Sequence, residues 1–161
     1  MTTLSSCILI KEGETMNINT KYFGNIEINP AKIISFFKGI PAFETIKEYT
    51  LLDLSDNNIF HCLQSIKHPE IAFFLITPWD FFPDYDINIP QEDLEDLNIT
   101  KIEQVAIYNI VTIPQDLKKI TANLLGPIVI NRETLQAKQV ILFQENYDTK
   151  HLLISGEKEE V

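Results

Sequence analysis

The stretch Ile71-Ala-Phe-Phe-Leu-Ile-Thr77 is followed at once by Pro78-Trp-Asp-Phe-Phe-Pro-Asp-Tyr85. The first seven residues are typical of a short β-strand. Pro78 and Pro83 lack a backbone N–H and fix φ, so the chain cannot continue there as a regular helix or a paired strand. The stretch therefore predicts a strand that ends in a stiff loop or sheet edge. That loop carries four aromatic rings beside two prolines and two aspartates.

Short strand candidates recur on both sides of this loop, and each is bounded by Gly, Pro, Asn or Asp. The candidates are residues 16–22, 26–28, 33–37, 49–54, 59–65, 71–77, 85–89, 104–113, 121–125, 128–131 and 138–143. Gly24 interrupts the first alternating pattern, which suggests a bend or a tight hairpin. Regular short strands with turn signals predict a mainly β protein, either an antiparallel barrel or a sandwich.

Helix signals are sparse. Residues 91–98 contain Leu94 and Leu97 three apart after Pro90, which predicts one short acidic helix. Residues 114–120 predict a further single turn. We expect one domain over residues 16–155, preceded by an N-terminal extension, 1–15, and followed by a charged tail, 156–161.

The composition is that of a globular domain with a real core, at 161 residues and 45% hydrophobic content. The net charge of -10 disfavours direct binding of nucleic acid. It suits a basic partner, and it equally fits a surface whose charge only maintains solubility. Two cysteines form no disulfide framework, and no apolar run approaches the length of a membrane span. These features predict a cytoplasmic protein that does not enter a membrane.

Reactive side chains are scattered rather than grouped. His61 and Cys62 are adjacent, but neighbours in a strand point to opposite faces and cannot form a nucleophile–base pair. The three histidines show no zinc spacing. A calcium-loop spacing at Asp84, Asp86, Asn88 and Glu95 fails because Ile89 stands where the turn needs Gly. We therefore predict no catalytic residues, no cofactor and no metal.

Several motifs, taken in order, resemble those of the flagellar assembly factor FliW family, and the resemblance covers nearly the whole chain after residue 15. They are residues 20–24 with 26–28, Phe36 with 39–44, 63–65 with Pro69 and 72–73, 81–85, 109–114, 127–131 and 138–142. The chain departs from the family pattern at Phe37, commonly Pro, at Ala42, commonly Gly, and at His61-Cys62, usually an aromatic pair.

The resemblance implies a cytoplasmic bacterial protein that is not an enzyme and has a small, mostly antiparallel β-barrel-like fold. Such proteins bind the translational regulator CsrA and stop it from repressing flagellin mRNA. They also bind flagellin, so that free flagellin releases CsrA. The expected partners are therefore CsrA and flagellin, in a partner-switching and chaperone role.

A stiff aromatic loop flanked by acids is suited to binding another protein, because rigid aromatics bury much area at little entropic cost. The predicted partner-binding residues are Trp79, Asp80, Phe81, Phe82, Asp84, Tyr85, Asn123 and Pro127. For Phe82 and Tyr85 a second role stays open, that of plugging the end of the barrel. Two other functions also stay open: a barrel that carries a small ligand, and a hydrolase built on His61, Asp80 or Asp84.

The expected N-terminal extension gives a direct test. Deleting residues 1–15 should leave the melting temperature unchanged, because a dispensable extension contributes nothing to the core. Thermal unfolding of the full and the shortened chains measures this. A large drop in melting temperature would show that the segment packs on the domain.

Overall fold

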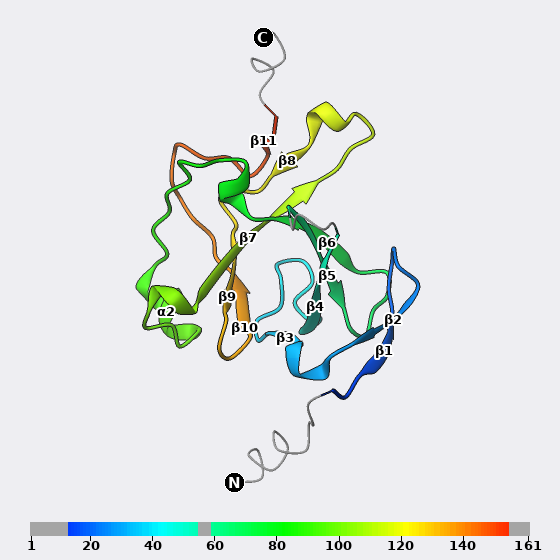
Figure 1. The fold of residues 1–161 in the computed structure, drawn as a ribbon. Coiled ribbons are helices and arrows are strands. Elements are labelled where there is room, and N and C mark those ends of the chain that lie inside the picture. Colours follow the sequence, from blue (N-terminus) through cyan, green and yellow to red (C-terminus); the bar gives the residue numbers. More distant parts are fainter. Residues whose placement is uncertain (1–12, 55–58, 155–161) are drawn as a thin grey trace.

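The computed structural model describes residues 13–54 and 59–154 of the chain (Figure 1). Most of the regular structure in these ranges is β-strand. The strands are β1 (Met16–Asn19), β2 (Asn25–Ile28), β3 (Ile34–Phe36), β4 (Glu48–Asp53), β5 (Phe60–Ser65), β6 (Ala72–Ile76), β7 (Val105–Thr112), β8 (Thr121–Ala122), β9 (Ile128–Asn131), β10 (Gln136–Gln139) and β11 (His151–Leu152). The α-helix α2 (Gln91–Asp96) and four 3-10 turns complete the set: η1 (Pro30–Lys32), η2 (Pro78–Asp80), η3 (Ile102–Gln104) and η4 (Leu117–Lys119).

Seven strands close into a barrel in the order β7-β6-β5-β4-β3-β10-β9, because β9 also pairs with β7. Neighbouring strands run antiparallel except β10 and β3, which pair in parallel. The long strand β7 makes this closure possible. Its first half pairs with β9, and its last two residues pair with β8. The predicted mainly β, barrel-like fold is confirmed.

The barrel interior is filled by side chains that alternate inward along the strands. Phe36 and Tyr49 pack edge to face, with ring centroids 5.1 Å apart. The buried residues of this core are Ile34, Phe36, Ile40, Tyr49, Leu63, Leu75, Ile128, Ile130 and Ala137. Two further apolar clusters complete the packing, one with Tyr85 and Leu124 and one with Leu97 and Val129.

The hairpin of β1 and β2 forms a separate two-stranded sheet beside the barrel. Gly24, at φ 66°, lets the chain reverse, and the Thr20 N–H donates to its carbonyl oxygen at 2.9 Å. Gln64 on β5 holds the hairpin, because its Oε1 accepts from the Lys21 N–H at 3.1 Å. The Tyr22 ring stacks on Phe74 of β6, with centroids 5.0 Å apart. Of the alternatives that the sequence left open at Gly24, a bend or a tight hairpin, the structure shows the hairpin.

Residues 85–89 are not a strand, and that prediction was wrong. The alternation is real, since Ile87 and Ile89 pack into the apolar clusters while Asp86 and Asn88 are exposed. The backbone, however, bonds to side chains: the Asp86 N–H donates to Tyr147 Oη at 2.7 Å and the Asn88 N–H to Gln144 Oε1 at 3.2 Å. Alternating buried and exposed side chains therefore occur here although the backbone pairs with side chains and not with a strand.

The predicted helix at 91–98 is present as α2 and ends two residues earlier. Asn98 takes φ 55°, and the Ile99 N–H donates back to the Leu94 carbonyl oxygen at 2.9 Å, which closes the helix. Lys138 of β10 ties α2 to the barrel, with Nζ 3.0 Å from Asp96 Oδ2. Its hydrogen bond, with one from Lys38, lowers the pKa of Asp96.

Other predicted elements are shorter than expected. The predicted strands 16–22 and 121–125 shrink to β1 and β8, and the predicted turn at 114–120 is η4. The predicted strand 138–143 is displaced, because β10 begins at Gln136 and ends at Gln139. The N-terminal extension lies outside the described residues up to position 12, and so does the whole of the charged tail, 156–161.

Two positions in the turn after β3 give matched stability predictions. Gly39 has φ 67°, and a Cβ there would lie 2.5 Å from the Glu44 backbone. Ala42 has φ 75°, a conformation that costs an L-residue about 1 kcal/mol or more. We expect Ala42→Gly to stabilise the protein by about 1 kcal/mol and Gly39→Ala to destabilise it by more than that. Urea unfolding of both variants measures the difference, and equal stabilities would contradict the assigned turn.

Candidate functional site

The loop of residues 78–85, called here the aromatic loop, leaves the barrel wall directly after β6. Pro78 opens the 3-10 turn η2, where its missing N–H costs nothing because first-turn donors have no partner. The Phe82 N–H then donates to the Pro78 carbonyl oxygen at 2.8 Å, and the Tyr85 N–H to Phe82 at 2.9 Å. The loop is thus built from consecutive tight turns, as its prolines predict.

Tyr85 anchors the aromatic loop to the core. Its side chain is 4% exposed, and its hydroxyl donates to the Leu124 carbonyl oxygen at 2.7 Å. The Asn109 amide lies 3.4 Å from the same hydroxyl, and the Tyr147 ring packs at 4.9 Å. Burial raises the pKa of Tyr85 to about 12. Of the two roles left open by the sequence, the structure places Tyr85 in packing, so it cannot serve as an exposed contact.

Trp79 is the exposed ring of the loop, at 41%. Its indole Nε1 donates to the Tyr85 carbonyl oxygen at 2.9 Å, and its ring meets the Tyr85 ring at 5.8 Å. The indole is therefore held in one orientation while a large part of its surface faces solvent. A pre-positioned aromatic side chain loses little entropy when a partner covers it.

The two phenylalanines are half-buried. Phe81 packs on Phe60, with ring centroids 5.7 Å apart, and Phe82 meets His151 at 5.1 Å. Both rings border the cluster that contains Tyr85, so Phe82 contributes to packing and keeps part of its surface outside. Asp80 and Asp84 are exposed, as expected for carboxylates at a rim.

The second predicted contact region is mostly structural. Asn123 is half-buried; its Oδ1 accepts from the Leu125 N–H at 3.1 Å, and its carbonyl accepts from Asn109 at 2.7 Å. Pro127 is buried, and its carbonyl accepts from the Val140 N–H at 2.9 Å. The burial of Pro127 therefore differs from the exposed contact that the sequence led us to expect.

His61 and Cys62 do not form a reactive pair. The His61 Nδ1 lies 2.8 Å from Asp53 Oδ1, and no polar partner reaches the buried His61 Nε2 within the described ranges. Burial raises the pKa of the Cys62 thiol to about 11, which keeps it protonated and a weak nucleophile. His61 is thus paired with Asp53, which was not among the residues that the hydrolase hypothesis named: His61, Asp80 and Asp84.

Over residues 13–54 and 59–154, no three His, Cys, Asp or Glu side chains gather closely enough to hold a metal ion. None of the helices in those ranges has the length and apolar content to cross a bilayer.

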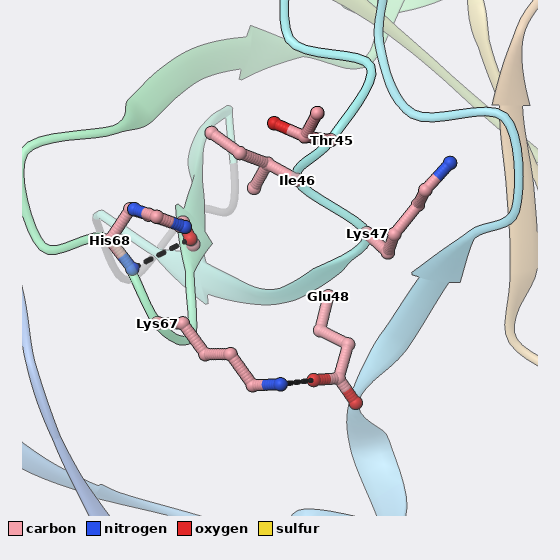
Figure 2. A pocket seen from close by; sticks show the side chains of 7 residues that line it. Thr45, Ile46, Lys47, Glu48, Lys67 and His68 are labelled. Carbon is pink, nitrogen blue, oxygen red and sulfur yellow. Dashed lines mark hydrogen bonds and ion pairs between the residues drawn. The ribbon is translucent and has the colours of Figure 1, made fainter.

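Figure 2 shows a small hollow between the start of β4 and the turn after β5, with a volume of about 90 Å³. Lys67 Nζ lies 3.5 Å from Glu48 Oε1 across it, and the His68 N–H donates to Ser65 Oγ at 3.1 Å. Small-molecule sites usually occupy about 300 to 1,000 Å³. The hollow is therefore a gap beside a surface ion pair rather than a binding site.

A much larger groove of about 840 Å³ lies beside the aromatic loop. One side is formed by residues 85–91 with α2 and residues 99–102, and the other by the first half of β7. Trp79 and Thr77 line it together with Arg132. Sequence analysis missed this groove, because its two sides come from segments that carry no shared motif. The alternating apolar side chains at Ile87 and Ile89 were the one sequence feature that could have indicated a side of this groove.

The fold and this surface define a class: a small closed β-barrel that presents a rigid aromatic loop and an apolar groove. A model of the FliW protein family matches residues 17–153. Flagellar assembly factors FliW from Bacillus velezensis and Geobacillus kaustophilus are 41% and 46% identical to the chain, covering 88% and 86% of it and 99% and 95% of their own lengths. A crystal structure of a flagellar assembly factor FliW superposes with a TM-score of 0.83 at 43% identity, covering 88% of this chain and 99% of the other. The chain belongs to the FliW family of flagellar assembly factors.

The two most buried tyrosines give a matched stability prediction. Tyr85→Phe removes the donor to Leu124 and should destabilise the protein by about 1 to 2 kcal/mol at pH 7, whereas Tyr49→Phe should cost less, because Tyr49 Oη has no partner in the described ranges. Urea unfolding compares them. Equal losses would contradict the anchoring role of Tyr85.

The same tyrosines predict how stability changes at high pH. Burial raises the pKa of Tyr49 and of Tyr85 to about 12, whereas the unfolded side chains titrate near 10. Their contribution is thus complete below pH 10 and is lost as the pH rises from about 10 through 12. Either Phe variant should reduce this loss. Unfolding free energies between pH 8 and 11 check the slope, and an unchanged slope would contradict the burial of these hydroxyls.

Proposed function

We propose that the protein binds the translational regulator CsrA, prevents it from repressing flagellin mRNA, and releases it when flagellin binds. Family membership supports the general role, flagellar assembly. The resemblance of the motifs supports the partners. In this proposal the protein works in the cytoplasm, changes no covalent bond and contacts neither nucleic acid nor membrane.

The observation that carries the proposal is the rigid, exposed Trp79 between acidic side chains. Asp80, Asp84 and Asp86 are all exposed within seven residues of Trp79, and the whole chain carries a net charge of -10. A regulator that binds RNA presents positive charge, so an acidic surface increases its encounter rate. Once docked, the same charge repels the RNA that competes for the regulator.

Partner exchange follows from mass action when both proteins use one domain. CsrA bound to this domain is withheld from its mRNA, and flagellin that accumulates takes the domain and frees CsrA. Size-exclusion chromatography of the protein with CsrA, followed by added flagellin, tests this directly. A complex that flagellin leaves intact would contradict the exchange, and the lack of any complex would contradict the function.

Trp79 should contribute more to CsrA affinity than the charges around it. Trp79→Ala should weaken binding by about 2 kcal/mol, roughly 30-fold, because a buried aromatic anchor is lost. Asp80→Asn with Asp84→Asn should mainly slow association and reduce its salt dependence. The matched control, Glu14→Gln with Glu27→Gln, makes the same change in charge at exposed positions near the β1–β2 hairpin and should bind normally. Calorimetry and stopped-flow measurements on folded variants check these effects, and an unaffected Trp79→Ala would contradict the site.

A further inference from the structure

The pairing between β6 and β7 stops halfway along β7. The paired residues are Phe74 with Val111, Leu75 with Ile110 and Ile76 with Asn109. In the same register, residue 78 comes opposite residue 107. Pro78 stands there without an N–H, and its carbonyl already accepts from Phe81 and Phe82 within η2. The ladder therefore ends, and the chain turns away into the aromatic loop.

The free edge of β7 faces the groove at Ile107. The Asn123 N–H donates to the Ile110 carbonyl at 2.9 Å, so even-numbered backbone groups of β7 face β8 and β9, and odd-numbered groups face the β6 side. Val105 has partners there, because its N–H donates to Ile102 and its carbonyl accepts from Arg132 Nε at 3.0 Å. Ile107 therefore presents its N–H and C=O on the edge that Pro78 leaves open.

Apolar side chains flank this open edge on the groove side. Ile87, Ile89 and Leu94 line the opposite wall. Ile102 is 83% exposed at one end, and Trp79 is 41% exposed at the other. A strand edge between two apolar rows is the arrangement that accepts an extended peptide, whose backbone pairs with the edge while alternate side chains fill the pockets.

The two ends of the groove carry opposite charge. Asp86 lines the end at Trp79, with Asp80 exposed on the neighbouring turn. Lys101 and Arg132 line the end at Val105, and both are exposed. These charges therefore favour one direction of a segment that lies along β7, in addition to the preference for apolar side chains.

We propose that the groove takes an extended, mainly aliphatic segment of a partner protein as an added strand on β7. The segment runs antiparallel to β7 and so continues the direction of β6. It places a basic residue near Asp86 and an acidic group near Lys101 and Arg132. The inference rests on the proposed function, since it assigns a surface through which this protein holds a partner.

Other occupants would use the groove differently. A helix has no free backbone groups along its length, so it would leave the Ile107 N–H unpaired. A small apolar ligand would fill the volume without protecting that amide. The state of the Ile107 amide in the complex therefore separates an added strand from both alternatives.

The first measurement locates the binding surface. Ile102→Glu puts a charge into the groove at a side chain exposed enough to leave folding intact. Leu117→Glu introduces the same charge at an exposed aliphatic side chain in η4, which does not line the groove. Calorimetric titrations with purified flagellin and with purified CsrA should show at least tenfold weaker binding of one of them to Ile102→Glu. Leu117→Glu should bind both normally.

The second measurement tests the pairing. Amide exchange of the ¹⁵N-labelled protein, followed by NMR, should show Ile107 exchanging at least tenfold more slowly in that complex than in the free protein. The inference is overturned if a complex forms while Ile102→Glu binds normally, or while Ile107 exchange is unchanged, and in either case the proposed function stands. If neither flagellin nor CsrA binds at all, both the inference and the proposed function are overturned.

Discussion

Pro78 has no backbone N–H, and the register of the barrel places it opposite Ile107 on β7. The antiparallel ladder between β6 and β7 must end there, since one of the two bonds of the next pair cannot form. The chain consequently leaves the wall through η2 and folds into the aromatic loop. One missing donor thus creates two neighbouring features, a loop with an exposed indole and a strand with an open edge.

The aromatic loop keeps its shape because a buried side chain anchors it to the core. Tyr85 is buried and donates to Leu124, and the Trp79 indole donates to the Tyr85 carbonyl. The exposed ring is therefore oriented through the buried one. Such a surface is already organised before a partner arrives, which reduces the entropic cost of binding. Acidic side chains around it add long-range attraction for a basic protein.

The sequence predicted the strands well because they are short, separated by Gly, Pro, Asn and Asp, and alternate in polarity. These features fit a barrel and a sandwich equally, and only the family resemblance implied the barrel. Prediction failed at residues 85–89, where the alternation reflects burial on one side and the hydrogen bonds go to Tyr147 and Gln144. No local pattern distinguishes such a segment from an edge strand. The parallel pairing of β10 with β3 and the closure of β7 on β9 also depend on contacts distant in the chain.

The candidate site was only half predictable for the same reason. The aromatic loop is local, so its prolines, rings and acids are visible in one stretch. Whether a ring faces inward depends on distant residues, as Leu124 and Tyr147 show for Tyr85. The groove is lined by residues from 85–102, from β7 and by Arg132, and no spacing in the sequence indicates that these segments lie together.

The most direct test of the central claim is to map, by NMR, which amides of the ¹⁵N-labelled protein shift when unlabelled CsrA is added. The shifts should concentrate on the aromatic loop, residues 78–85, and should give way to those of the flagellin complex when flagellin displaces CsrA. Shifts confined to the β1–β2 hairpin or to β3 and β4, with the aromatic loop unchanged, would contradict the claim.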